Sequence, residues 1–188
     1  MTTLSLKEKH ELAVANDLLA ALRIEHEFLR LGAAGIEPDV VYRIAAQSVG
    51  IEVATAYYDE PQAKAEWQIA RGILKPDNHG ITKIGRWSEP DQLIAAQVQR
   101  ELEDKCAKDY SGVDSTWLCI EQRALLADVS ETSDLVAHLK VPERHPFVRI
   151  YVGAYAHAGD GGGFRGAKGA VQGGSRSVQQ AHRPDAGG

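Results

Sequence analysis

The stretch Pro38-Asp39-Val40-Val41-Tyr42-Arg43-Ile44, followed by Ser48-Val49-Gly50-Ile51-Glu52-Val53-Ala54-Thr55-Ala56-Tyr57, decides the fold. Both runs are rich in β-branched residues, which favour strands. Pro38 stands first in its run, where a strand needs no backbone donor. Ala45-Ala46-Gln47 predicts a short turn, although it lacks the Asn-Gly or Asp-Gly pair of the tightest hairpins. We therefore predict two strands that can pair as a hairpin.

Two carboxylates mark these strands as chemically important. Strand alternation places Ile51 and Val53 on one face, and Glu52 and Ala54 on the other. Glu52 interrupts an apolar strand, where an ionised group needs a partner or a metal. Twelve residues separate Asp39 from Glu52, enough for a hairpin that brings both carboxylates to one end of a sheet. Such a pair suits Mg²⁺, which binds one or two carboxylates together with water and substrate phosphate.

The rest of the chain alternates between helix and strand patterns. Helical periodicity or helix-start signals predict helices over 6–31, 62–71, 91–108 and 133–140. Apolar runs predict further strands at 116–120 and 146–152. Several turn-forming residues predict a long loop over 72–90. The fold class expected is α/β, with a mixed central sheet flanked by helices in a single domain over residues 1–158.

A change in composition at Gly159 predicts a disordered, low-complexity tail over 159–188. Glycine is abundant there without a collagen-like period, and such a composition cannot support a packed fold. Scattered arginine and lysine residues make this tail mildly basic, as a nucleic-acid-contacting segment would be. An extension without a role is the interpretation we prefer.

Composition and charge limit the function classes. The chain is 44% hydrophobic and 25% charged, with no apolar run of the ~18–20 residues that span a bilayer. The N-terminal residues lack an apolar signal core, so we expect a cytoplasmic protein and no membrane partner. Cys106 and Cys119 lack the spacing of a structural zinc site. A net charge of −5 counts against a general DNA-coating protein, and less against a nuclease with a local contact surface.

Across roughly residues 20–60 the sequence resembles the PD-(D/E)XK nuclease superfamily. The matching pieces are Glu25, Gly35, Pro38-Asp39-Val40-Val41 and Gly50-Ile51-Glu52-Val53. Holliday-junction resolvases of archaea and type IV restriction endonucleases are the most similar members. The resemblance implies a restriction-endonuclease-like fold and an endonuclease that hydrolyses phosphodiester bonds in DNA, or less plausibly RNA, with Mg²⁺ or Mn²⁺. A homodimer is a reasonable arrangement for an enzyme that cuts a duplex.

The resemblance also implies roles for individual residues. Asp39 and Glu52 become metal ligands that also serve catalysis, and the backbone carbonyl of Val53 becomes a further metal ligand. Glu25 becomes an accessory metal ligand, because the superfamily places a glutamate on its first helix. Glu27 competes for this role, but the spacing of Glu25 puts it on the apolar stripe of the expected helix.

One position departs from the family pattern. Ala54 stands where the family has a lysine that activates the attacking water, and alanine cannot do this. Lys64 on the following helix could supply the missing amine, as happens in some members of the family. Gln62 and Gln68 resemble the positions of substrate-orienting glutamines, and Arg86 belongs to a loop cluster of basic residues that could meet phosphate.

Two alternatives stay open. Ala54 favours a catalytically inactive nuclease-fold module that binds nucleic acid or a protein partner, and the net negative charge favours the protein. Alternatively, Asp39 and Glu52 are incidental to a protein-binding domain. A structure with these two carboxylates on opposite faces of the sheet would establish the last case.

Overall fold

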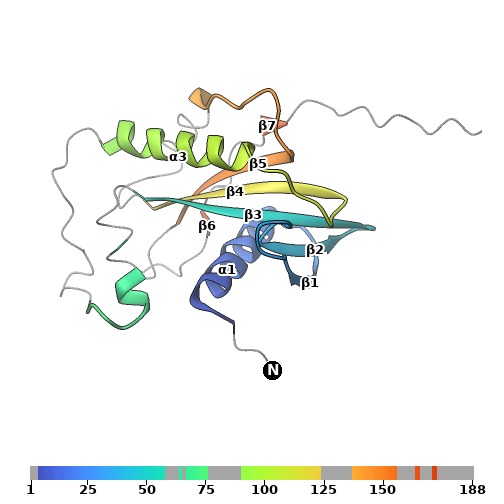
Figure 1. Ribbon diagram of the computed structural model, residues 1–188, viewed down its shortest axis with the longest axis horizontal. Coiled ribbons are helices and arrows are strands. Elements are labelled where there is room, and N and C mark those ends of the chain that lie inside the picture. The colour runs from blue at the N-terminus through green and yellow to red at the C-terminus, as the bar shows by residue number, and fades with distance from the viewer. Residues whose placement is uncertain are drawn as a thin grey trace, which may run out of the picture.

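The computed structural model describes residues 4–57, 64, 67–75, 90–123, 137–155, 164–165 and 171–172. Its elements form a mixed sheet between two helices (Figure 1). The helices are α1 (Leu6–Ala21) and α3 (Pro90–Cys106). The longer strands are β1 (Glu27–Leu31), β2 (Val40–Ile44), β3 (Gln47–Tyr57), β4 (Ser115–Arg123) and β5 (Phe147–Tyr155), and they lie in this order across the sheet.

The sheet combines two kinds of strand pairing. β1, β2 and β3 pair antiparallel, whereas β3, β4 and β5 pair parallel. Parallel neighbours need a crossover connection, and α3 lies in the one between β3 and β4. The two helices cover opposite faces of the sheet (Figure 1). The predicted α/β class, with a mixed central sheet flanked by helices, is therefore confirmed.

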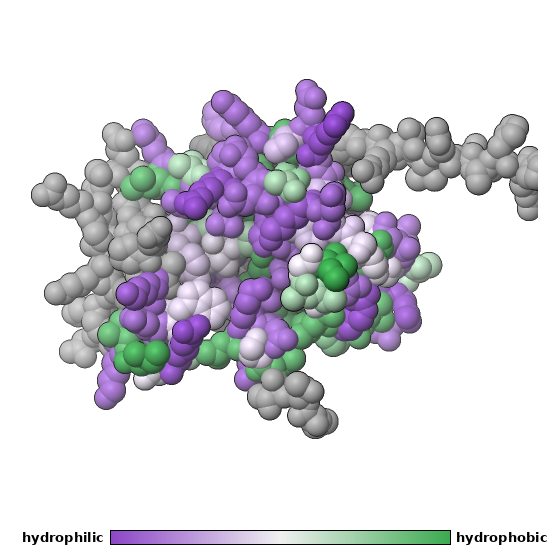
Figure 2. All heavy atoms as spheres, in the orientation of Figure 1, coloured by the Kyte–Doolittle hydropathy of each residue, from purple (hydrophilic) through white to green (hydrophobic). Residues whose placement is uncertain are grey.

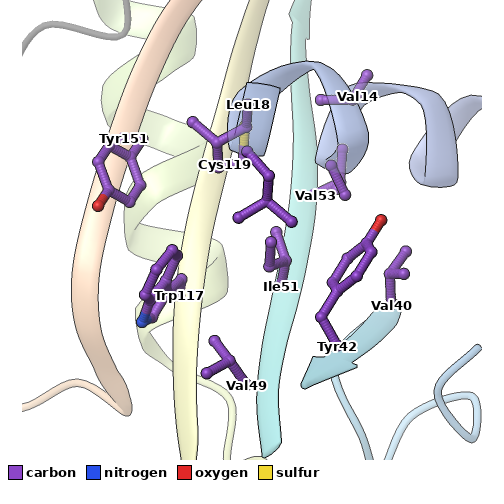
Figure 3. Close-up of a cluster of buried hydrophobic side chains, with 12 residues drawn as sticks. Val14, Leu18, Val40, Tyr42, Val49, Ile51, Val53, Trp117, Cys119 and Tyr151 are labelled. Carbon is purple, nitrogen blue, oxygen red and sulfur yellow. The ribbon is translucent and has the colours of Figure 1, made fainter. Parts of the chain in front are cut away.

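Each face of the sheet carries its own hydrophobic core. Ile51 and Val53 of β3 pack with α1 residues such as Leu18, as Figure 3 shows. Ala54 belongs to the other core, beneath α3. The predicted alternation along β3 is thus confirmed, and it places the neighbouring Glu52 on the α3 side. Over α3 itself, hydrophilic side chains predominate on the surface (Figure 2).

The β2–β3 hairpin forms as the sequence predicts. Its register runs from the pair Val40 and Ile51 to the pair Ile44 and Gln47. Ala45 in the turn has a φ of 55°, the positive value that two-residue hairpin turns require. The turn is one residue shorter than predicted, because Gln47 already pairs within β3.

The long N-terminal helix predicted to reach Leu31 is wrong at its C-terminal end. The helix ends at Ala21, Arg23 has a positive φ of 54°, and Glu27–Leu31 forms β1. β1 pairs with the edge of β2 and satisfies backbone groups there. Periodicity alone cannot separate a short apolar strand from a helix segment, so tertiary pairing decided this region.

The other predicted elements are found with modest shifts where the structure describes them. α3 replaces the helix predicted at 91–108, and β4 and β5 extend the strands predicted at 116–120 and 146–152. Of the helices predicted at 62–71 and 133–140, residues 64, 67–70 and 137–138 are helical, whereas 71 and 139–140 are not. The other residues of these two predicted helices lie outside the described ranges. Most of the loop predicted over 72–90 also lies outside the described residues.

The C-terminal segment differs from the expectation of disorder at four residues. β6 (Phe164–Arg165) and β7 (Val171–Gln172) both pair antiparallel with β5. All the other residues of 159–188 lie outside the described ranges, so the disorder expected for them stays a prediction. Within the described part of the chain, no helix is both long and apolar enough to cross a membrane.

Candidate functional site

The site lies where β2 and β3 separate. Their ladder ends at the pair Val40 and Ile51, and extending the same register places Asp39 opposite Glu52. Side chains directly opposite each other in an antiparallel pair project from the same face. Asp39 also reaches across to β3, where its Oδ2 accepts a hydrogen bond of 2.9 Å from the backbone N–H of Val53. The two carboxylates predicted from the sequence are therefore brought together.

Close packing around Pro38 positions Asp39. A Cβ atom at Gly50 would overlap the Pro38 ring, and one at Gly32 would overlap the Pro38 carbonyl group. The Gly32 N–H donates to the Asp39 carbonyl oxygen at 2.9 Å. Glycine at positions 32 and 50 therefore lets the chain before β2 lie against its neighbours.

An ion pair anchors the same connection from its other side. Arg30 of β1 donates two hydrogen bonds of 2.8 Å to the carboxylate of Glu37, one to each oxygen. Such two-point pairing fixes orientation as well as distance. The Ala33 N–H donates to Glu37 at 2.9 Å, which closes the loop on itself. The backbone leading into Asp39 is thus held at both ends.

Lys105 of α3 and Lys108, just beyond the C-terminal end of α3, neutralise Glu52. The Glu52 side chain is only 5% exposed, and its Oε1 lies 2.5 Å from the Nζ of Lys105. Lys108 is more distant, at 3.9 Å from the same oxygen. A buried carboxylate needs such a partner, because losing its hydration is costly. The sequence reasoning missed Lys105, although the position of α3 over the Glu52 face follows from the crossover.

The first turns of α1 bring a second acid–base pair. Lys7 contacts Glu11 at 2.9 Å and Asp39 at 3.9 Å. The hydrogen bond with Glu11 is the largest cause that raises the pKa of Lys7. A capping box between Ser5 and Glu8 fixes the start of the helix. Glu11 is buried and, unlike Glu25, lies on the first helix beside Asp39.

These side chains line one cavity of about 630 Å³. Its walls include Glu11, Asp39 and Glu52 together with Lys7 and Lys105. Acidic groups from a helix and two strand regions thus face basic groups from both helices across the same space. The arrangement can hold a cation against the carboxylates and an anionic group against the lysines.

Burial raises the pKa of Asp39 above its ordinary value. The Val53 N–H opposes this shift, Glu11 adds to it, and the positive charges of Lys105 and Lys7 oppose it. The net direction is upward, because burial disfavours the charged form of this carboxylate. A positive group delivered to the cavity would stabilise that charge.

Tyr110 adds a buried hydroxyl near Glu52 to the cavity wall. Its hydroxyl oxygen is buried and has no hydrogen-bond partner among the described residues. Burial, and then the nearby Glu52 carboxylate, raise its pKa well above the usual range, so the hydroxyl stays protonated. Buried polar groups are rarely left unpaired, which makes this hydroxyl a candidate contact for a bound molecule.

The donor chemistry fits a divalent cation in part. Within the described ranges, no three His, Cys, Asp or Glu side chains are grouped closely enough to hold one metal ion. Asp39 and Glu52 nevertheless match the one or two carboxylates that Mg²⁺ takes from a protein. Lys105 and Lys7 hold carboxylates of this cavity in ion pairs.

The other site residues predicted from the sequence do not gather here. Glu25 is exposed beyond the end of α1, which corrects its expected helical position, and Glu27 lies in β1 and pairs with Arg43 at 3.0 Å. Lys64 is exposed and Gln68 half-buried, and neither lines the cavity. Two predicted substrate contacts, Gln62 and Arg86, lie outside the described residues.

A second polar cluster lies at the far end of β3 and β4. Glu121 is fully buried, and its carboxylate contacts His10 at 3.1 Å and Arg123 at 3.1 Å. Thr55 donates to the same carboxylate at 3.2 Å. These contacts tie α1 to the sheet close to Lys7 and Glu11. The sequence reasoning missed this cluster, since its members are far apart along the chain.

Comparison with known proteins adds no relative: no family model, curated protein or solved structure matches this chain.

Proposed function

We propose that this protein is a metal-dependent endonuclease that hydrolyses phosphodiester bonds in DNA. The fold proposed with this function is the restriction-endonuclease-like fold of the PD-(D/E)XK superfamily. One observation carries the proposal: Asp39 and Glu52 line one cavity where the β2–β3 ladder ends, and Lys105 lines the same cavity. Paired carboxylates and a nearby amine are the groups that this hydrolysis needs.

Asp39, Glu52 and the backbone carbonyl of Val53 are the proposed ligands of Mg²⁺ or Mn²⁺. Glu11 replaces Glu25 as the accessory carboxylate, because it lines the same cavity and Glu25 does not. When bound, the metal supplies Lewis-acid stabilisation of phosphate charge and an activated water. The residues of the chain orient that centre and exclude bulk water from its buried side.

Lys105 is the amine that we propose in place of the one missing at Ala54. Its Nζ already lies beside Glu52, whereas Lys64 is exposed and lines no part of the cavity. Lys7 is a further positive group at the opposite wall. Both ammonium groups can donate hydrogen bonds to phosphate oxygens, since lysine carries three rotatable donors.

DNA is the proposed partner, and the contact must be local because the chain carries a net charge of −5. Lys7, Lys105 and Lys108 line the cavity and provide such a local basic surface. A homodimer and a cytoplasmic location remain expectations that accompany this proposal.

Calorimetric titration with Mn²⁺ and Mg²⁺ tests the proposed site. The unaltered chain should bind metal, and Asp39→Asn and Glu52→Gln should each abolish binding while the circular dichroism spectrum is retained. Glu27→Gln is the matched control, because Glu27 is an exposed acid of β1 that does not line the cavity. Supercoiled and linear DNA should then be cut only by proteins that bind metal. Failure of the unaltered chain to bind metal, even beside a DNA oligonucleotide, rejects the enzyme.

An inactive nuclease-fold module that binds nucleic acid or a protein is the second candidate. The close pairing of Lys105 with Glu52 favours it, because the buried carboxylate already has a counter-ion. Ala54, which stands where the family has a lysine, also favours this candidate. Binding of DNA without metal, together with no cleavage in Mg²⁺ or Mn²⁺, would support this candidate over the enzyme.

A further inference from the structure

The contact between Lys105 and Glu52 has a consequence for metal binding. The Glu52 side chain is 5% exposed and that of Lys105 is 16% exposed, so both charged ends lie largely out of water. The Lys105 ammonium group donates a hydrogen bond of 2.5 Å to Oε1 of Glu52 and so occupies that oxygen. A buried pair of this kind is maintained because neither charge is well solvated alone.

The Lys105 ammonium group can move more than the Glu52 carboxylate can. Glu52 lies in the interior of β3, whose backbone is paired with β4 along this stretch. Lys105 lies in the last turn of α3 and has a flexible four-carbon stem. Its Nζ can therefore leave Glu52 while both backbones stay in place. Lys108, at 3.9 Å and with its side chain 54% exposed, is a weaker second counter-ion.

We infer that Lys105 is a resident counter-ion of Glu52, which a divalent cation must displace before it can bind Oε1. This inference rests on the proposed function and adds a form of regulation to the same site. Two cations at one carboxylate oxygen repel each other strongly at low dielectric. Metal entry therefore releases the Lys105 ammonium group into the cavity, where an anionic substrate is the available partner. Lys105 opposes metal binding and favours substrate binding.

Lys105→Met keeps the stem of the side chain and removes its charge. The variant tests the inference because its expected effects on metal affinity and on substrate affinity have opposite signs. Mn²⁺ affinity, measured by calorimetry without DNA, should rise by on the order of tenfold. Affinity for a double-stranded DNA oligonucleotide, measured by fluorescence anisotropy in Ca²⁺, should fall. Lys108→Met should move both affinities in the same directions by less. Lys9→Met is the control, because Lys9 is an exposed lysine of α1 that does not line the cavity.

A folding control accompanies these measurements, since Lys105→Met leaves Glu52 without its nearest partner. Lys105→Gln retains a neutral donor for Glu52 and should also raise Mn²⁺ affinity. Lys105→Arg retains the charge and should not raise it. A thermal melt followed by circular dichroism verifies that each variant is folded.

The results separate this inference from the proposed function. Metal binding by the unaltered chain, with equal or weaker binding by folded Lys105→Met and Lys105→Gln, overturns the counter-ion role alone. Absence of metal binding from the unaltered chain and from both neutral variants overturns the proposed function and the inference with it. Metal binding by the neutral variants alone supports the counter-ion role of Lys105, whereas the proposed enzyme is rejected because the unaltered chain then binds no metal.

Discussion

The carboxylate of Asp39 replaces a strand partner for Val53. Its Oδ2 accepts the Val53 N–H at 2.9 Å, just beyond the last paired residues of β2 and β3. The hydrogen bond fixes Asp39 against the backbone next to Glu52. The Asp39 side chain thus accepts a backbone hydrogen bond at the end of the β2–β3 ladder, and the same contact holds it in the candidate site.

Asp39→Asn should show that this aspartate lowers stability at neutral pH. Burial, the largest cause, raises its pKa above 3.8 in the folded protein. A group with a raised folded pKa contributes stability below its unfolded pKa and loses it as the pH rises through the folded pKa. The free energy of unfolding of Asp39→Asn, relative to the unaltered protein, should therefore increase from below pH 3.8 towards neutral pH. Urea titrations at several pH values measure this difference.

Asp39→Ala separates the hydrogen bond from the charge. Asparagine keeps an oxygen that can accept from Val53, whereas alanine leaves the N–H unpaired. We expect Asp39→Ala to be less stable than Asp39→Asn by about 1–2 kcal/mol, the cost of an unsatisfied buried donor. Equal stability of the two variants would show that the Val53 bond contributes nothing.

Gly50→Ala should destabilise the protein by about 1–3 kcal/mol, because its methyl group would overlap the Pro38 ring. The strain should also weaken metal binding by displacing Asp39. Pro38→Gly removes the ring, so the double variant should recover part of the loss. Urea unfolding of the two single variants and the double variant measures the coupling. Strictly additive losses would contradict the assigned contact.

Glu121→Gln should cost about 1–3 kcal/mol at neutral pH, because it removes the charge that His10 and Arg123 contact. Burial raises the pKa of Glu121, but the hydrogen bond with His10 and the charge of Arg123 outweigh it and lower the pKa below 4.5. A depressed folded pKa contributes stability above the unfolded pKa and loses it as the pH falls through the folded pKa. The difference between variant and unaltered protein should shrink below pH 4.5 in acid-unfolding curves.

Tyr110→Phe should leave stability unchanged or raise it by about 1 kcal/mol, since the hydroxyl is buried without a partner. If the hydroxyl contacts a bound molecule, the same variant should weaken DNA binding in Ca²⁺. Phe147→Leu, which alters the ring packed against Tyr110, is the structural control. A marked loss of stability in Tyr110→Phe would indicate an unrecognised hydrogen bond.

Local pattern predicted part of the site. Strand alternation placed Ile51 and Glu52 on opposite faces, and the hairpin spacing brought Asp39 to Glu52. These relations depend on neighbours in sequence and on the two-residue period of a strand. The same reasoning placed Glu25 on a helix, because a five-residue strand has too few positions to reveal its period.

The acidic and basic side chains from the helices needed tertiary structure. Glu11 and Lys7 reach Asp39 only because α1 packs across one face of the sheet. Lys105 reaches Glu52 because α3 covers the other face. Spacing along the chain does not encode these distances, since Lys105 is 53 residues from Glu52.

The sequence by itself determined the α/β class, the β2–β3 hairpin and the pair formed by Asp39 and Glu52. Each follows from local periodicity and from turn chemistry. Tertiary structure alone decided that Glu27–Leu31 is a strand, that Glu11 rather than Glu25 lies by Asp39, and that Lys105 neutralises Glu52. The physical reason is that packing and buried charge pairing join residues according to their positions in space, which a one-dimensional pattern does not contain.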